Sequence, residues 1–320
     1  MKILAIQNRM GIGDTVIFLP YIKALFKKFN SPISLLVKES SKADQYLYET
    51  DYVDKIILLD GPNNTKNKNN GIIESFFLIK DLRQFKFDKI FIFNSSLRFN
   101  LIAKFSGISE IYQYPLFQKT GQHITDTPKK FLKDKIDLNV NEDPEIQINK
   151  KTIVDAIEKL QINKKDTNIL LGIGGSGPTK RIPAKTFLGV IEKILETRKC
   201  KFYLAGGRNE DEQIIFKEIL ESKFKKFCYP LDKFSIKETL PVIKCCNLAI
   251  CNDSSFSHLS AALGVKTITL MADTPLIYGN YNTKMFPIIP DGESTVTHKT
   301  LGKDKINPEK IFNKFIEIIN

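Results

Sequence analysis

Cysteines and long apolar runs are scarce in this sequence of 320 residues. The five cysteines form no CxxC pair and all lie in the second half of the chain, which argues against a disulfide framework or a cysteine-based zinc site. No apolar stretch approaches the roughly 18 residues that a membrane-spanning helix needs. The apolar part of the opening segment MKILAIQNRM is too short for a signal peptide. We therefore expect a soluble, cytoplasmic protein.

Several motifs of nucleotide and nucleic-acid binding are also missing. The turn GIGD at 11–14 is not a dinucleotide fingerprint, because position 16 is valine instead of glycine, and no GK[ST] follows as in a P-loop. No RNP, zinc or helix-turn-helix signature is present, and aromatic residues are not interleaved with the basic ones. We expect no nucleic-acid partner.

Positive charge is in excess, with 48 Lys and Arg against 36 Asp and Glu and a formal net charge of +12. An anionic partner, such as a phosphorylated glycolipid or an anionic membrane, would explain this excess. A lysine-rich composition that solvates helix surfaces would explain it equally well, and composition does not separate the two.

Short β-rich segments alternate with helix-period segments along the chain, which is the pattern of parallel sheets covered by helices. Strands are predicted at 3–7, 33–37, 55–59, 89–93, 168–172, 201–205, 248–251 and 267–271. The polar tract between Gly61 and Gly71 is predicted to be a loop. The polar segment 138–150 carries Pro144 and marks a domain boundary. We predict an α/β protein with two Rossmann-like domains, 1–150 and 151–307, facing each other across a cleft, and a terminal helix at 308–320.

Asp14 lies where the first strand ends in the GIGD turn and a helix begins. A carboxylate at the carboxyl end of a parallel strand points to the crevice where open α/β sheets bind ligands. The same residue could simply cap the helix, and spacing alone favours the cap.

The segment GIGGSGPTK at 172–180 follows a predicted strand and joins glycine amides, the Ser176 hydroxyl and the Lys180 ammonium. This combination suits a diphosphate, although a flexible loop with a solvated lysine is the alternative.

In NDSSFSHLSAALG at 252–264, a strand ends and Asp253, Ser254 and Ser255 open a helix that carries His258. Asp253 could be a plain N-cap and His258 a satisfied histidine, and in isolation the segment favours that interpretation.

Taken in order, these segments resemble glycosyltransferase family 9, the heptosyltransferase-like enzymes of lipopolysaccharide core assembly, over essentially the full chain. The resemblance rests on GIGD with Pro20, SSLRFNLIAKFSG at 95–107, the glycine loop with Lys180, AGGRNEDE at 205–212 and NDSSFSHLSAALGVKTITL at 252–270. It implies the GT-B fold and inverting transfer of a sugar from a nucleotide donor, most simply ADP-heptose, to an anionic glycolipid.

The resemblance also implies roles for individual residues. Asp14 would be the catalytic base, Arg9 and Arg98 would contact the acceptor, and the donor would be bound by Ser176, Lys180, Glu210, Asp253, Ser254, Ser255 and His258. Spacing leaves Glu212 open as the ribose contact in place of Glu210. Two departures weaken the match: Ser255 replaces a usual glycine, and Ala272 to Pro275 replaces a usual GPTDP.

We expect a monomer that needs no metal or other cofactor, touches the membrane at most peripherally, and packs its terminal helix back toward the first domain. Another nucleotide-sugar or acceptor, or a non-catalytic nucleotide-sugar-binding protein, remain alternatives.

Overall fold

The computed structural model describes residues 1–9, 11–59, 71–116 and 123–320, apart from the side chain of Ile72. The polar tract predicted to be a loop, with its two lysines, falls at 60–70 and lies outside the described residues. The chain forms two compact units, Met1–Pro144 and Glu145–Asn320. The boundary falls inside the polar segment 138–150. Each unit is described by itself below.

The first unit is built on a parallel sheet of five strands in the order β3-β2-β1-β4-β5. The strands are β1 (Ile3–Ile6), β2 (Ile33–Val37), β3 (Val53–Leu58), β4 (Lys89–Ile92) and β5 (Glu110–Gln113). All residues of β1 and β2 are buried, as expected for central strands of a parallel sheet covered on both faces.

Within the described residues, the α-helices of this unit are α1 (Ile12–Phe29), α2 (Ala43–Tyr46), α3 (Gly71–Phe85), α4 (Leu97–Phe105) and α5 (Asp126–Ile136). Leu82 of α3 and Phe99 and Ile102 of α4 share one apolar cluster with the sheet. On α1 and α5, Phe18 and Phe131 instead pack edge-to-face on Phe93 at ring distances of 5.5 Å each. Pro20 does not interrupt α1, which runs continuously from Ile12 to Phe29.

The second unit contains a parallel sheet of six strands in the order β11-β10-β9-β6-β7-β8. The strands are β6 (Thr167–Gly172), β7 (Cys200–Ala205), β8 (Cys228–Pro230), β9 (Leu248–Asn252), β10 (Thr267–Leu270) and β11 (Met285–Ile288). Counted along the chain from β6, this is the Rossmann order 3-2-1-4-5-6, and the described strands of the first unit follow the same order as 3-2-1-4-5.

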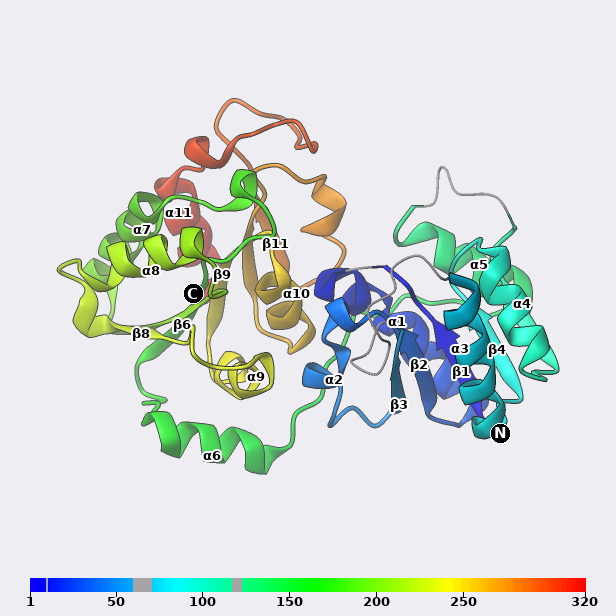
Figure 1. The fold of residues 1–320 in the computed structure, drawn as a ribbon. Helices are drawn as coiled ribbons and strands as arrows, with labels where there is room; N and C mark the ends of the chain where they lie inside the picture. Colours follow the sequence, from blue (N-terminus) through cyan, green and yellow to red (C-terminus); the bar gives the residue numbers. More distant parts are fainter. Residues whose placement is uncertain (10, 60–70, 117–122) are drawn as a thin grey trace. The chain divides into compact units, whose positions relative to one another are not determined.

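Two groups of helices cover the second sheet (Figure 1). On one face α7 (Ala184–Thr197), α8 (Glu210–Leu220) and α11 (Pro308–Ile319) share an apolar cluster with alternate strand residues. On the other lie α9 (Ile236–Lys244) and α10 (Ser255–Ala262), and α6 (Lys150–Leu160) packs on α9.

The terminal helix α11 belongs to the second unit. It lies against α7, and its residues Ile311, Phe315 and Ile318 are buried in the core of that unit. The apolar stripe of α7 must be covered on this face of the sheet, and the apolar residues of α11 cover it.

All eight predicted strands are present, each shifted by no more than a few residues, so the α/β fold class is confirmed. The prediction of a cleft between the domains is not tested. Three further strands, β5, β8 and β11, were missed. They lie at sheet edges and have three or four residues each, too few to show a clear periodicity.

Candidate functional site

Each sheet has a point where the strand order reverses, and ligands of open α/β sheets bind outside the carboxyl ends of the strands there. In the second unit this point lies between β6 and β9, which pair in parallel with Gly172 opposite Cys251. In the first unit it lies between β1 and β4, where Ile6 is opposite Ile92. The glycine loop follows β6, Asp253 follows β9, and Asp14 follows β1. All three predicted segments therefore lie at switch points of their own sheets.

Lys180 and Asp253 meet at the switch point of the second unit. Lys180 lies at the end of a short 3-10 turn after the glycine loop, and its Nζ donates to Asp253 Oδ2 at 2.9 Å. The Asp253 side chain is 4% exposed, whereas Lys180 retains 22%. An ammonium has three donors, so this pair leaves Lys180 able to bind a second anion.

His258 lies on the other side of the Asp253 carboxylate, with Nε2 at 3.9 Å from Oδ1. Burial alone would raise the pKa of Asp253, but the charges of His258 and Lys180 outweigh it and hold that pKa below its usual value. The carboxylate is therefore buried as an anion between the Lys180 ammonium and the His258 imidazole.

Tyr281 orients the histidine, and the sequence analysis missed it. His258 Nδ1 and the Tyr281 hydroxyl are 2.8 Å apart, and the two rings stack at 5.6 Å. This hydrogen bond engages Nδ1 and leaves Nε2 toward Asp253. Tyr281 lies outside every recognised motif, in a loop between β10 and β11, so no sequence signal pointed to it.

The amino end of α10 completes this cluster. Ser254 is the N-cap in extended conformation, and Ser255 is the first helical residue. Among the described residues, the buried Ser254 Oγ has no hydrogen-bond partner. The first amides of a helix and its dipole favour an anion at this end.

The two glutamates that spacing left open, Glu210 and Glu212, differ in their surroundings. The buried Glu212 carboxylate accepts hydrogen bonds from the amides of Gly175 and Gly207 and from the Asn209 side chain. Glu210, the first residue of α8, is exposed. Glu212 thus ties two glycine turns together, and Glu210 is the glutamate whose side chain faces solvent.

Packing against Glu212 therefore explains why one position of this loop is a glycine. A Cβ on Gly174 would lie 2.8 Å from Glu212 Oε2, closer than packed atoms allow. Gly177, in contrast, has open space around it, and Ser176 beside it is exposed. The diphosphate interpretation applies to the 176–180 end of the loop.

The loop at 272–275, which stands where the family usually has GPTDP, is held by hydrogen bonds. Asp273 is buried, its Oδ1 accepts from the Leu301 amide at 2.9 Å, and the Ala272 carbonyl accepts from Gly302 at 2.9 Å. The loop is thus fixed by residues far along the chain.

Asp14 in the first unit makes a contact that stabilises the start of α1. It is the third residue of α1, and Oδ2 accepts from the Gly11 amide at 3.2 Å, as a helix-capping carboxylate does. Its side chain still keeps 26% exposure, and Oδ1 lies 4.0 Å from an Arg9 guanidinium nitrogen. Capping therefore uses one oxygen and leaves the other available.

Arg98 begins α4 near the carboxyl end of β4. Its guanidinium donates to Glu74 Oε2 at 3.2 Å and to Ser75 Oγ at 2.8 Å, both on α3. Arg98 thus joins two helices, and 40% of its side chain is exposed.

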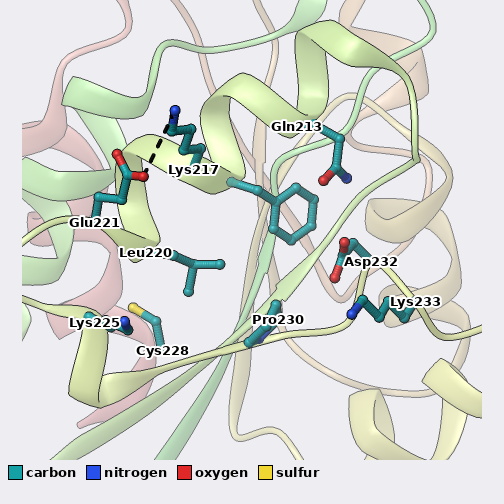
Figure 2. A pocket seen from close by; sticks show the side chains of 10 residues that line it. Gln213, Lys217, Leu220, Glu221, Lys225, Cys228, Pro230, Asp232 and Lys233 are labelled. Carbon is teal, nitrogen blue, oxygen red and sulfur yellow. Dashed lines mark ion pairs between the residues drawn. The ribbon is translucent and has the colours of Figure 1, made fainter.

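A cavity of about 550 Å³ lies elsewhere in the second unit, along α8 and the edge strand β8 (Figure 2). Its rim carries the ion pair of Lys217 and Glu221 at 3.9 Å. None of the predicted site residues lines it. Burial raises the pKa of its Cys228 thiol to about 11, which makes that thiol unreactive at neutral pH.

In the part of the chain that the structure describes, no cluster of three or more His, Cys, Asp and Glu side chains could hold a metal ion. Within the same residues, no helix is both long and apolar enough to cross a bilayer.

Comparison with known proteins points to one family. The model of glycosyltransferase family 9 (heptosyltransferase) matches residues 103–288, more than half of the chain. Lipopolysaccharide heptosyltransferase 1 of Campylobacter coli is 34% identical over 152 residues, which are 46% of this chain and 43% of that protein. The match thus spans less than half of that relative's length.

Solved structures share the fold over nearly the whole chain. A glycosyltransferase of family 9 from Veillonella parvula has a TM-score of 0.77 at 19% identity, covering 99% of this chain and 97% of its own. The ADP-heptose heptosyltransferase II of E. coli has a TM-score of 0.75 at 16% identity, covering 100% and 98%. An E. coli heptosyltransferase solved with ADP has 0.72 at 13% identity and covers both chains fully. At these identities the likeness shows the fold, which is the predicted GT-B fold.

Proposed function

Because the chain belongs to glycosyltransferase family 9, we propose that it is an inverting glycosyltransferase that transfers a sugar from a nucleotide diphosphate donor to an anionic glycolipid of the lipopolysaccharide-core type. The observation that carries this proposal is the contact of Lys180 with Asp253 beside the amino end of α10. Both lie in the stretch that the family model matches. The proposed donor is ADP-heptose, since one E. coli heptosyltransferase of the same fold was solved both with ADP and with ADP-2-deoxy-2-fluoro heptose.

In this proposal the second unit binds the donor. Lys180 and the first amides of α10 hold the diphosphate, and the buried Ser254 hydroxyl gains the partner that it lacks within the described residues. Ser176 and Ser255 lie at the two edges of the same anion site. Asp253, fixed between Lys180 and His258, accepts hydrogen bonds from the donor sugar.

Asp14 is the proposed base. It takes the proton from the acceptor hydroxyl, whose oxygen forms a bond to the anomeric carbon as the bond from that carbon to the diphosphate breaks. Charge then develops on the leaving diphosphate, and Lys180 and the α10 amides stabilise it without reorganisation. Attack opposite the leaving group inverts the anomeric carbon. The scheme assigns no step to a metal.

Arg9 and Arg98 are the proposed acceptor contacts, because they follow the neighbouring strands β1 and β4 at one edge of the first sheet. Glu210 is the proposed ribose contact, since its carboxylate faces solvent while Glu212 is held by backbone amides.

Thermal-shift measurements with ADP-, UDP- and GDP-sugars test the donor half. A ligand that binds only the folded protein raises the melting temperature, and we expect ADP-heptose to give the largest rise. Lys180→Ala should abolish that rise, whereas Lys185→Ala, an exposed lysine on α7, should retain it.

Turnover of ADP-heptose with a lipopolysaccharide-core acceptor tests the rest of the proposal. Donor binding without turnover on any such acceptor would identify a nucleotide-sugar-binding protein instead of a transferase. A shift with another nucleotide-sugar alone would assign a different donor.

A further inference from the structure

Exposed apolar side chains are concentrated on α3 and α4 of the first unit. Of the eleven large apolar side chains that are exposed among the described residues, six lie on these two helices, with exposures from 40% to 69%. These six are Ile73, Phe76, Phe77, Leu97, Leu101 and Phe105. Single exposed apolar residues need no explanation, but a cluster of this kind marks an interaction surface.

The two helices run side by side and in parallel (Figure 1). Arg98 at the start of α4 bonds to Glu74 and Ser75 near the start of α3, and Arg83 near the end of α3 donates to the Phe105 carbonyl at the end of α4. Arginine contacts at both ends therefore hold the helices in one orientation.

Helical spacing places the apolar residues together on the outer side. On α3, Ile73, Phe76 and Phe77 are three or four residues apart, while Leu82 faces the sheet. On α4, Leu97, Leu101 and Phe105 repeat every four residues, while Phe99 and Ile102 are buried. Each helix is thus apolar on both its inner and its outer side, and packing in this unit accounts only for the inner one.

Basic residues share this outer surface. Lys80 follows Phe76 and Phe77 by one helical turn, and Lys104 follows Leu101 by three residues, all exposed. The two helices carry four basic residues, Lys80, Arg83, Arg98 and Lys104, against the acids Glu74 and Asp81. Of these acids, Glu74 is paired with Arg98.

From this arrangement we propose that the outer surface of α3 and α4, formed by the six apolar residues with Lys80, Arg83 and Lys104, binds the surface of an anionic phospholipid bilayer. The aromatic rings enter the boundary between headgroups and acyl chains, and the flexible lysines reach the phosphates. Each lysine near such a surface contributes about a fivefold gain in binding.

The interleaved charges favour a bilayer over a second copy of the chain. A symmetric dimer would bring the same surface together with itself, so that Lys80 and Lys104 would approach the lysines of the partner, with more basic than acidic residues on both sides. The buried centres of protein interfaces are depleted of lysine for this reason.

Co-sedimentation with vesicles tests the proposal without donor or acceptor, so its outcome does not depend on the proposed function. We expect the protein to bind vesicles that contain phosphatidylglycerol, and to bind phosphatidylcholine vesicles weakly. Phe76→Ser with Phe77→Ser should weaken binding by about tenfold or more for each phenylalanine that enters the bilayer boundary. Lys80→Ala with Lys104→Ala should weaken it roughly fivefold for each lysine and should reduce its dependence on salt.

The matched controls are Val154→Ser with Ile214→Ser, exposed apolar residues of the second unit, and Lys185→Ala with Lys225→Ala. They should bind vesicles as the unchanged protein does. The proposal is overturned if the unchanged protein does not bind anionic vesicles, or if the controls weaken binding as much as the test variants. It is equally overturned if the phenylalanine pair abolishes a dimer, seen by sedimentation, and leaves vesicle binding intact.

Discussion

The two switch points of this protein have the same topology but opposite packing. In the second unit Lys180, Asp253, His258 and Tyr281 form a continuous set of contacts around a carboxylate that is 4% exposed. In the first unit the corresponding pair, Arg9 and Asp14, is separated by 4.0 Å and both side chains remain partly exposed. The side chains of one site are held by contacts with one another, and those of the other are open.

This difference matches the chemistry that each half is proposed to perform. A diphosphate needs fixed positive groups, because preorganised charges stabilise a developing anion without the cost of reorganisation. A base that serves a large acceptor needs access and one free oxygen, which Asp14 retains beside its capping contact. The predictions below test this contrast.

The largest effect is expected for Asp14→Asn. The N-cap of α1 is Gly11, and asparagine at position 14 keeps a side-chain oxygen that can accept from the Gly11 amide, so most of the stability of α1 should be retained. The variant cannot accept a proton, and turnover should fall by about 10²–10⁴-fold at unchanged donor affinity. Steady-state kinetics with a donor thermal shift would measure both quantities.

Asp14→Ala and Asp44→Asn complete this comparison. Alanine removes cap and base together and should add a loss of about 1 kcal/mol in stability, whereas Asp44, an acid in the first turn of α2, should tolerate the change. If Asp14→Asn keeps its turnover, Asp14 is a cap only.

The ion pair of the second unit should show the next largest effect. Lys180→Ala leaves the Asp253 carboxylate buried without its cation, a change that costs about 3–5 kcal/mol in fully buried pairs and less here, since Lys180 is partly exposed. Adding Asp253→Asn should restore part of that loss in the free energy of unfolding but none of the donor binding. Urea unfolding and donor thermal shifts of the single and double variants measure the two effects separately. Full additivity in the unfolding data would contradict the coupling.

Low pH should lower the stability of the second unit because it protonates the Asp253 carboxylate. The pKa of Asp253 is lower in the folded state than its usual value, so its contribution is fully present above the unfolded value of about 3.9 and is lost as pH falls through the folded value. Asp253→Asn should therefore lose less stability than the unchanged protein between about pH 4 and pH 2. Unfolding curves at a series of pH values test this, with Asp155→Asn on the exposed side of α6 as control. If the free energy of unfolding of all three proteins falls in parallel as the pH is lowered, Asp253 is not the cause of the loss.

The sequence predicted the central strands well because they are buried on both faces and therefore read as continuous apolar runs, as β2 and β6 do. The packing of α11 could not be predicted, since an apolar stripe shows that a helix needs a partner but not which one. Edge strands such as β8 have only one neighbouring strand and too few residues for a pattern.

Part of the candidate site could be predicted because its residues stand at the ends of these central strands. Lys180 and Asp253 stand in motifs at strand ends, where topology alone brings them together. Glu212 could not be separated from Glu210 by spacing, because the choice depends on the space left by Gly174 and on the Gly175 and Gly207 amides. Such contacts between distant turns exist only after folding.

A change at Tyr281 tests whether the contacts around Asp253 orient His258 or only pack against it. Tyr281→Phe keeps the ring against His258 but removes the hydroxyl at Nδ1, a hydrogen bond that contributes about 0.5–1.5 kcal/mol. If the hydroxyl orients the histidine, turnover should fall by roughly two- to tenfold, because the hydrogen bond at Nδ1 that directs Nε2 toward Asp253 is removed. Tyr278→Phe, in the preceding 3-10 turn, should leave turnover unchanged. A reduced melting temperature with unchanged turnover would make Tyr281 a packing residue, and the contacts around Asp253 would then end at His258.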